Sequence, residues 1–257
     1  GMAAALGDKA KKTRSRDEAG DFDLYVLAQT WAPVFCCSHP NKCNTVTWAY
    51  SATHLSLHGL WPGYAQARGG HTYPSNCESK AKLIVADLPS HFVDIAPSYC
   101  GYNTAKHAPE LGKLGVHEWQ KHGTCTSLEP GKYMAEAVRV VESLTGPGGA
   151  KKFDRGTPTV LTSKIGSPEG VPANELRLSY ARHVAIRVDN HCRLEEVTSC
   201  WAKLSDGTVG EQVHCPEYLL RSARNSIIEG SCSNVLVVKL GQCLAAEQKR
   251  AAAANKR

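Results

Sequence analysis

The chain has 257 residues, of which 30 are Lys or Arg and 24 are Asp or Glu, and its apolar fraction is 42%. This length can bury a core as one large domain or two small ones without a structural metal. No apolar run approaches the roughly 18 residues of a membrane helix, so we expect a soluble protein that has no contact with a membrane. The net charge of +6 is compatible with a polyanionic partner but does not demonstrate one.

The 11 cysteines are many for a protein of a reducing compartment, and none of their spacings is the CxxC pair of zinc ribbons or thioredoxins. We therefore expect disulfides and an oxidising location, either secreted or in the lumen of a lysosome or vacuole. The chain begins Gly-Met and shows no apolar signal segment, so we interpret it as a mature form. Because the count is odd, one thiol remains unpaired.

Charge and composition divide the chain into three parts. Residues 1–20 combine many basic side chains with little apolar content, which predicts a disordered basic arm. Residues 246–257 predict a flexible tail of Lys, Arg and Ala. Between them, residues 21–245 contain no internal repeat and no linker, so we expect a single domain.

Two extended stretches open this domain. Residues 22–31 are largely apolar and predict a mostly buried strand. After a cysteine-rich loop, residues 46–60 predict a second strand with His58 near its end. Residues 59–63 read Gly-Leu-Trp-Pro-Gly, and we expect this glycine and proline content to stop the strand and leave Trp61 at a turn. An imidazole beside a free aromatic ring is typical of an acid–base group next to a stacking platform, although an ordinary strand end explains the segment equally well.

Ionisable residues are concentrated in residues 117–125, His-Glu-Trp-Gln-Lys-His-Gly-Thr-Cys. On a helix that runs to the glycine, the spacing of four residues brings Glu118 beside His122 and His117 beside Lys121. An acid, a base and two cationic groups then lie on adjoining strips of one helix. A helix end with histidines as caps or surface residues accounts poorly for so many ionisable types in one place.

The spacing of His117 and His122 argues against a zinc site. A zinc protease helix carries its two histidines four residues apart on one face. Here they are five apart, which turns the helix by roughly 140°. This spacing argues against a metalloprotease helix, and we expect the protein to use neither a metal nor a cofactor.

The remaining part of the domain predicts a mixture of helices and strands. The segment 81–96 predicts a helix that breaks at Pro89, and residues 131–144 predict an amphipathic helix. Further elements are expected as a helix at 173–183 and strands at 184–188, 194–201, 213–218 and 235–240. Strands at both ends of the chain with helices between them indicate an α+β fold.

Two segments, Leu57-His58-Gly59-Leu60-Trp61-Pro62 and residues 117–125, closely resemble the two active-site segments of the ribonuclease T2 family, which includes plant S-like ribonucleases. They occur here in the family's order. The resemblance extends over residues 21–232 and implies a single domain whose central, mainly antiparallel sheet is flanked by helices and stapled by disulfides. Supporting similarities are Gln29 and Trp31, the segment from Tyr73 to Cys77, and the series Cys192, Cys200, Cys215 and Cys232.

The family implies a metal-independent endoribonuclease that cleaves single-stranded RNA by transphosphorylation to a 2′,3′-cyclic phosphate, which it hydrolyses more slowly. One group must take the proton of the 2′-hydroxyl while another gives a proton to the leaving 5′-oxygen. Histidine suits both tasks because its unperturbed pKa is about 6.5. The negative charge that develops on the phosphorane calls for a cation and hydrogen-bond donors close by.

By motif position, the resemblance makes His122 the general base and His58 the general acid, with the roles exchanged in hydrolysis. It implies that Lys121 and Glu118 bracket the phosphate. The implied substrate-binding residues are His117 for the phosphate, Trp61 and Tyr73 for base stacking, and Gln29.

Two departures from the family pattern bear on base preference. Many members have an aspartate that reads a base edge where this chain has Gly63. An aromatic pair often precedes the second histidine segment, where this chain has Leu114-Gly115-Val116. With a polar contact and a stacking face both missing, we expect broad or altered base preference.

The resemblance also implies a disulfide pattern. Cys43 pairs with Cys36 or Cys37, and Cys100 with the other; we take Cys36–Cys43 and Cys37–Cys100 as the first option. Cys243 falls outside the pattern and is expected to be the free thiol. The other implied pairs are Cys77–Cys125, Cys192–Cys232 and Cys200–Cys215.

A different class of function is a non-catalytic RNA-binding or signalling protein on the same fold, which arises when such proteins lose their histidines. The presence of both His58 and His122 argues for an enzyme instead. We expect a monomer whose partner is single-stranded RNA. His54, on the same predicted strand face as His58, is the other histidine with some claim to lie near the cleft.

Overall fold

The computed structural model describes residues 17–38, 50–221 and 232–242. The predicted basic arm up to residue 16, the start of the predicted second strand and the predicted tail lie outside these residues. The helices and strands are β1 (Leu24–Thr30), α1 (Ala32–Ser38), β2 (Ser56–Gly63), α2 (Phe92–Ile95), β3 (Cys100–Asn103), β4 (Ala108–Leu111), α3 (Lys113–Lys121), α4 (Pro130–Ser143), β5 (Phe153–Asp154), β6 (Thr157–Pro158), α5 (Thr159–Thr162), β7 (Val171–Pro172), α6 (Ala173–Leu178), β8 (Ala185–Val188), β9 (Leu194–Lys203), β10 (Val209–Val213), α7 (Glu217–Leu220) and β11 (Asn234–Val235).

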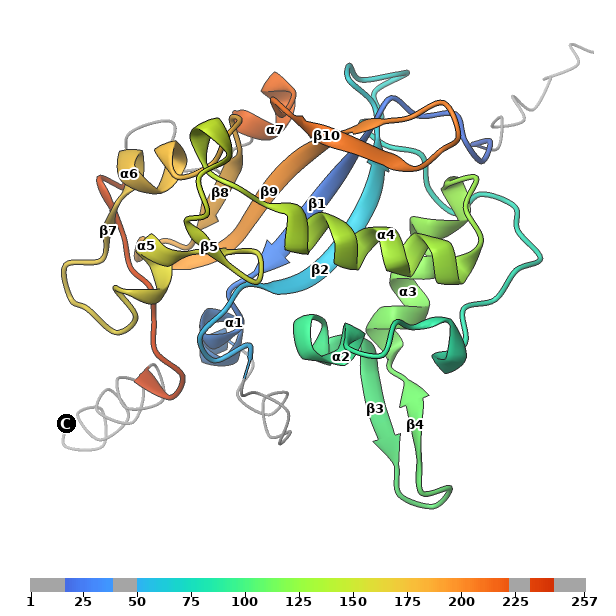
Figure 1. Ribbon diagram of the computed structural model, residues 1–257, viewed down its shortest axis with the longest axis horizontal. Helices are drawn as coiled ribbons and strands as arrows, with labels where there is room; N and C mark the ends of the chain where they lie inside the picture. Colours follow the sequence, from blue (N-terminus) through green and yellow to red (C-terminus); the bar gives the residue numbers. More distant parts are fainter. Residues whose placement is uncertain (1–16, 39–49, 222–231, 243–257) are drawn as a thin grey trace, which may run out of the picture.

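The central sheet has five antiparallel strands in the order β10-β9-β1-β2 (Figure 1). The fifth strand, β8, pairs with the first half of β9. β10 pairs with the second half of β9 on the same side, away from β1. β1 is an interior strand between β9 and β2, and nearly all of its residues are buried because both faces of the sheet are covered there. The α+β fold with an antiparallel sheet and flanking helices is thereby confirmed.

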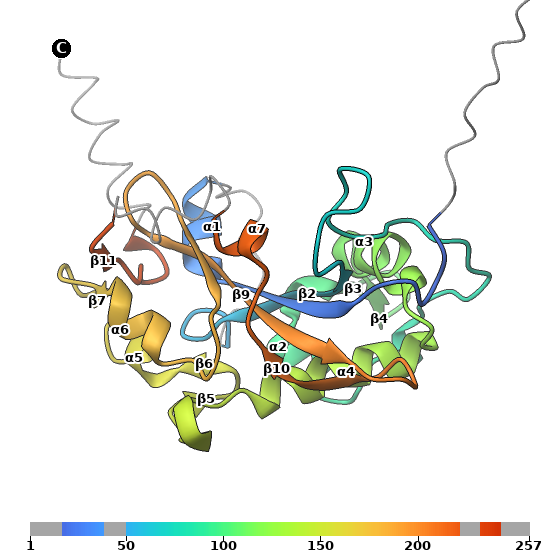
Figure 2. The ribbon, with the colours of Figure 1, turned by 90° about the horizontal axis from the view of Figure 1, so that it is seen from above.

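The two faces of the sheet bury different sets of side chains. Alternate residues of β1, among them Tyr25 and Leu27, enter the large cluster of buried side chains beneath α4, which we call the main core. The residues between them, Leu24 and Val26, join a smaller cluster that includes Leu219 of α7. Figure 2 shows α4 and α7 on opposite sides of the sheet. We call the α7 side the site face, since the functional residues lie on it.

The second strand continues further than its sequence predicts. The expected turn at residues 59–63 is wrong, because β2 runs through Gly63, which pairs with Leu24. β2 forms an edge of the sheet, and an edge strand tolerates Pro62 because one of its two sides has no ladder to complete. Trp61 is therefore held on a strand instead of at a turn.

The predicted helix of residues 117–125 is present and starts earlier, as α3 from Lys113. A 3-10 turn, Gly123–Cys125, follows it. The packing requires glycine at position 123, because a Cβ atom there would overlap the Trp119 ring. The predicted amphipathic helix of residues 131–144 is also present, as α4.

Several other predicted elements are wrong in type or length. The helix expected over 173–183 ends at Leu178, and the strand expected over 235–240 is only Asn234–Val235. The helix expected over 81–96 is reduced to a 3-10 turn, Val85–Asp87, and the four-residue α2. The strand expected over 213–218 stops at Val213, and α7 follows instead. Pro216 explains the change, since proline ends a strand ladder and its fixed φ suits the start of a helix.

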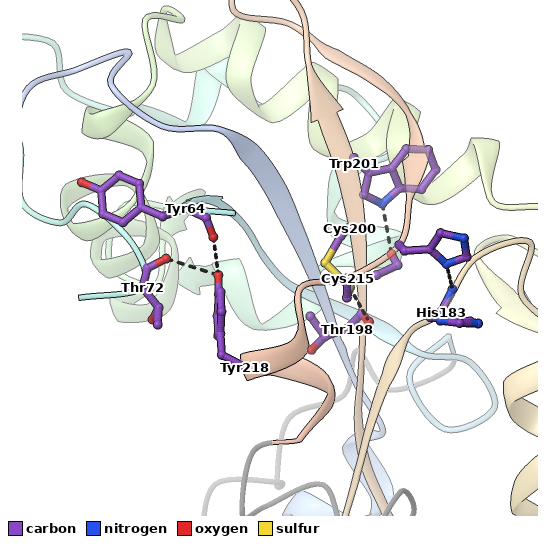
Figure 3. Close-up of a disulfide and its surroundings, with 10 residues drawn as sticks. Tyr64, Thr72, His183, Thr198, Cys200, Trp201, Cys215 and Tyr218 are labelled. Atoms are coloured by element: carbon purple, nitrogen blue, oxygen red, sulfur yellow. Dashed lines mark hydrogen bonds between the residues drawn. A yellow bond between two sulfur atoms is a disulfide. The ribbon is translucent and has the colours of Figure 1, made fainter. Parts of the chain in front are cut away.

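Three of the implied disulfides are present: Cys77–Cys125, Cys192–Cys232 and Cys200–Cys215. The last one joins β9 to the residues that lead into α7 (Figure 3). From α7, the Tyr218 hydroxyl donates to the carbonyl oxygens of Tyr64 and Thr72, at 2.8 and 3.3 Å. The disulfide and these hydrogen bonds together tie the loop after β2 to the site face.

The implied pairing of Cys100 is wrong. Cys100 is a free thiol at the start of β3, whereas Cys36 and Cys37 are both disulfide-bonded. A sulfur forms a single disulfide, so the bond that Cys37 makes elsewhere excludes Cys37–Cys100. The predicted Cys36–Cys43 pair and the state of Cys243 involve residues outside those that the structure describes.

Candidate active site

A β-bulge sets the direction of His58. Ala28 pairs with Gly59 and Gln29 pairs with Leu57, so His58 is an extra residue in β2. The extra residue allows Leu57 and Leu60 both to enter the main core, which strict alternation would forbid. His58 thereby turns to the site face.

The backbone around His58 is held from below. The buried Tyr99 donates its hydroxyl to the carbonyl oxygen of His58 at 2.7 Å. Tyr133 of α4 donates in the same way to the carbonyl oxygen of Leu60. Both tyrosines belong to the main core, so the position of the bulge depends on core packing.

A buried carboxylate of α3 links the helix to β2. The Trp61 indole donates from Nε1 to Oε2 of Glu118 at 2.6 Å. Glu118 is only 2% exposed, and its Oε1 lies 3.7 Å from Nε2 of His58. Glycine is required at position 59 because a Cβ atom there would overlap both Trp61 Nε1 and Glu118 Oε2.

Burial and charge act on Glu118 in opposite directions. Burial raises the pKa of the Glu118 carboxyl above its ordinary value. The hydrogen bond from Trp61 and the positive charges of His58, His117 and Lys121 offset part of this rise. The carboxyl therefore holds a proton more readily than an exposed glutamate does.

His58 lies between two carboxyl groups. Its Nδ1 is 2.8 Å from Oε2 of Glu196 on β9, and Glu118 faces its other ring nitrogen. Burial alone would lower the pKa of His58, but the hydrogen bond and charge of Glu196, together with Glu118, raise it above its ordinary value. Arg187 of β8, 3.6 Å from Oε1 of Glu196, opposes this rise.

His122 has very different surroundings. It follows α3 directly, its ring lies 5.2 Å from the Trp61 ring, and it is 5% exposed. Its Nδ1 is buried and has no hydrogen-bond partner in the described part of the chain. Burial, with the nearby charges of Lys121, His117 and His58, lowers the pKa of His122 to about 3.

The remaining predicted residues of α3 and the loop after β2 border this centre. The Tyr73 ring is exposed and lies 5.6 Å from the His122 ring. The Lys121 ammonium lies 5.5 Å from the Tyr73 ring. His117 is exposed on α3 and acts on Glu118 and His122 through its charge.

Gln29 does not belong to the site, contrary to the prediction. It is buried on β1, on the main-core face of the sheet, where its side-chain amide donates to the carbonyl oxygen of Gly156 at 3.2 Å. Its register partner Leu57 also faces the main core, whereas His58 faces the opposite side. His54 is likewise elsewhere, 3.0 Å from Asp154.

Sequence reasoning missed Glu196. The residue belongs to β9, a strand of mixed polar and apolar residues, and pairs with Thr30 on the site face. Alternation along β9 puts Glu196 on the same face as the buried Cys200, and this is the signal that could have identified it, because buried carboxylates are rare without a partner. Within residues 17–38, 50–221 and 232–242, no three or more His, Cys, Asp and Glu side chains are grouped to hold a metal ion.

The sequence of the chain matches a known family. The sequence model described as the Ribonuclease T2 family matches residues 22–147. A ribonuclease from Aeromonas hydrophila is 30% identical over 138 residues, which are 52% of this chain and 52% of that protein. "Intracellular ribonuclease LX" of Solanum lycopersicum is 30% identical over 125 residues, 46% of this chain and 47% of that protein. The matches thus extend over about half the length of these curated relatives.

The fold has solved counterparts over a greater length. An RNase-related protein from Calystegia sepium superposes with a TM-score of 0.52 at 21% identity, covering 76% of this chain and 91% of that one. The family match covers both histidine segments but ends before β9, so Glu196 lies beyond it. No helix in the described ranges has the length and apolar content that crossing a membrane requires.

Proposed function

We propose that this chain, whose residues 22–147 belong to the ribonuclease T2 family, is a metal-independent endoribonuclease that cleaves single-stranded RNA through a 2′,3′-cyclic phosphate. The observation that carries the proposal is a pair of imidazoles in opposite environments around one indole. His58 is paired with carboxylates that favour its cation, and His122 is buried where its neutral form is favoured. One histidine is thus prepared to give a proton and the other to take one.

The first step follows from these protonation states. Neutral His122 takes the proton of the 2′-hydroxyl as that oxygen attacks phosphorus. The P–O2′ bond forms while the P–O5′ bond breaks, and His58 gives its Nε2 proton to the departing 5′-oxygen. In hydrolysis the flow reverses: His58 takes a proton from water, whose oxygen forms a new bond to phosphorus as the P–O2′ bond breaks, and His122 protonates the 2′-oxygen.

A pKa of about 3 in the free protein makes His122 a weak base, and the substrate corrects this. The phosphodiester is an anion, and its field stabilises an imidazolium beside it. Binding of RNA therefore moves the pKa of His122 back toward the range in which a general base is effective. The free protein keeps the ring neutral and ready for this change.

Glu118 and Lys121 are proposed to stabilise the phosphorane. Lys121 supplies a positive charge at the rim, next to Tyr73. In the free protein the Glu118 carboxylate faces His58; because burial raises its pKa, the carboxyl is able to take up a proton when the phosphate anion binds and donate it in a hydrogen bond to a phosphoryl oxygen. Oε1 is the atom available for this, since Oε2 accepts from Trp61. His117 would contact an adjacent phosphate from its exposed position.

The packing supports the proposed change in base preference. A Cβ atom at Gly63 would lie 3.1 Å from Val26, so this position offers little room for a base-reading carboxylate. A Cβ atom at Gly115 would lie 2.9 Å from the carbonyl oxygen of Tyr99, which leaves no room for an aromatic ring there. We expect a panel of dinucleoside phosphates to be cleaved with broad preference, and a strong preference for purines of the aspartate-dependent kind would contradict this.

The decisive experiment compares an oligoribonucleotide with its 2′-deoxy counterpart, with and without EDTA, for wild type, His58→Ala and His122→Ala. We expect wild type to leave cyclic phosphate ends on RNA alone and to be unaffected by EDTA. Each variant should lose about 100-fold or more of the activity. Cleavage of the deoxy strand, abolition by EDTA or unchanged variants would refute the proposal.

We further propose that the protein acts as a monomer in an oxidising compartment, secreted or in the lumen of a lysosome or vacuole. Three disulfides among the described residues favour such a compartment. A non-catalytic RNA-binding role is supported by no observation, because the catalytic pair is present and differently tuned.

A further inference from the structure

Glu196 brings a third element, β9, to a site that otherwise consists of β2 and α3. Its side chain is 8% exposed, and Oε2 lies 2.8 Å from Nδ1 of His58. His58 is thus closer to Glu196 than to its other carboxyl neighbour, Glu118, whose Oε1 is 3.7 Å from Nε2. A hydrogen bond of this length between a ring nitrogen and a carboxylate orients the ring.

We propose that Glu196 is the positioning residue of the acid: it fixes the ring of His58 with Nδ1–H toward β9 and keeps the imidazolium charged until the 5′-oxygen leaves. The inference rests on the proposed ribonuclease function and adds a residue to it. Glu196 contacts His58 and not the reacting atoms, and it takes no proton. It acts through the tautomer and charge of the ring.

The geometry divides the ring nitrogens between two tasks. Nδ1 donates to Glu196, so the transferable proton is the one on Nε2. The distance from Nε2 to Glu118 Oε1 is 3.7 Å, which is too long for a hydrogen bond and leaves Nε2 available to the leaving oxygen. The bulge and the Tyr99 hydroxyl fix the backbone of His58, while Glu196 fixes its ring.

The charges that face His58 come from every element packed around it. Glu196 on β9 and Glu118 on α3 favour the imidazolium, whereas Arg187 on β8 disfavours it. His122, which follows α3, would repel it if charged. Glu196 combines hydrogen bond and charge, so its removal should change the protonation of His58 more than removal of Arg187 does.

Glu196→Gln separates this role from simple support of the fold, because the two reaction steps need opposite states of His58. Transphosphorylation needs the imidazolium, so the alkaline limit of its pH–rate profile, the pH above which the rate falls, should move to lower pH. We expect the rate to drop about tenfold or more near pH 8 and less near pH 5. Hydrolysis of a 2′,3′-cyclic nucleotide needs neutral His58, so its acid limit should also move to lower pH. The ratio of hydrolysis to transphosphorylation near pH 5 should therefore rise.

Two neighbouring variants serve as controls. Glu195 is adjacent on β9 but forms an ion pair with Arg187 at 3.1 Å, whereas Glu196 is the residue hydrogen-bonded to His58, so Glu195→Gln should leave both profiles close to wild type. Arg187→Gln removes the opposing cation and should move the alkaline limit of transphosphorylation to higher pH. Opposite shifts in Glu196→Gln and Arg187→Gln are the signature of an electrostatic effect on His58.

Nuclear magnetic resonance titration of the His58 ring tests the inference without reference to catalysis. We expect the ring of Glu196→Gln to lose its proton at lower pH than that of wild type, with the Nδ1–H tautomer no longer favoured. If both steps fall in proportion at all pH values, or the titration is unchanged in a folded variant, Glu196 is only structural and the inference fails. If wild type itself cleaves no RNA, the proposed function fails, and the titration still decides the role of Glu196.

Discussion

The two histidines of the site differ most in what their ring nitrogens contact. His58 has a carboxylate on Nδ1 and a second one facing Nε2, so its tautomer is set by the protein. His122 has a buried Nδ1 with no partner in the described residues, and aromatic rings surround it. Nearby carboxylates thus raise the pKa of His58, whereas burial lowers the pKa of His122.

This difference explains how one histidine can give a proton and the other can take one at the same neutral pH. The bulge in β2 brings His58 to Glu196 on β9, whereas His122 follows α3 directly and packs against Trp61. Trp61 touches both rings and also holds Glu118, so the two environments meet at a single indole. Substitutions at this indole, at either histidine or at the loop beside them should therefore disturb the contrast at different points.

The largest effect should come from Gly59→Ala. The new methyl group would overlap Trp61 Nε1 and Glu118 Oε2, and so separate the two environments where they meet. We expect activity to fall by about 100-fold or more and stability by about 2 kcal/mol, in line with overpacking of buried sites. Initial rates and urea unfolding measure the two quantities.

Gly101→Ala is the matched control for this change. Gly101 lies on β3, and a Cβ atom there would have no neighbour within 4 Å. Activity and stability should both stay close to wild type. A Gly59→Ala enzyme with undiminished activity would show that the contact between Trp61 and Glu118 is dispensable.

Next in size is the effect of pH on stability, which should have opposite signs for the two histidines. The pKa of His122 falls from 6.5 unfolded to about 3 folded, so its contribution is complete above about pH 6.5 and is lost as the pH drops toward 3. In that window wild type should lose about 1.4 kcal/mol per pH unit relative to His122→Phe. Urea unfolding at several pH values gives both slopes.

His58 provides the internal contrast for that measurement. Its folded pKa is raised, so its contribution is complete below the unfolded pKa and is lost as the pH rises through the folded value. Relative to His58→Gln, wild type should therefore lose stability on the alkaline side. Slopes of the same sign for both histidines would contradict the assignment of opposite environments.

The smallest effect should come from Tyr218→Phe. This change removes the hydroxyl that holds the carbonyl oxygens of Tyr64 and Thr72, next to Tyr73 and the binding side of His122. Loss of such hydrogen bonds is worth about 1 kcal/mol, so we expect KM for a dinucleoside phosphate to rise about fivefold with kcat unchanged. Steady-state kinetics with Tyr180→Phe as control, which removes a buried hydroxyl without a partner in the described chain, should show no change in KM.

Local patterns in the sequence were enough to predict the fold class and much of the secondary structure. The apolar run of β1 and the periodic stripe of α4 are local signals, and both elements are present where the pattern places them. The failures lie where a long-range partner overrides the local pattern. Pro62 remains in a strand because β2 is an edge, and Cys37 pairs elsewhere than with Cys100.

For the site, the sequence alone determined which residue types are present: two histidines, a glutamate, a lysine and a tryptophan in two recognisable segments. It did not determine their protonation or their complete set of partners, because pKa values depend on burial and on charges that arrive from distant elements. Only the tertiary structure brought Glu196 from β9 to His58 and turned Gln29 away to the main core. A one-residue bulge in β2 turned His58 toward Glu196, since one extra residue changes which face of the sheet a side chain occupies.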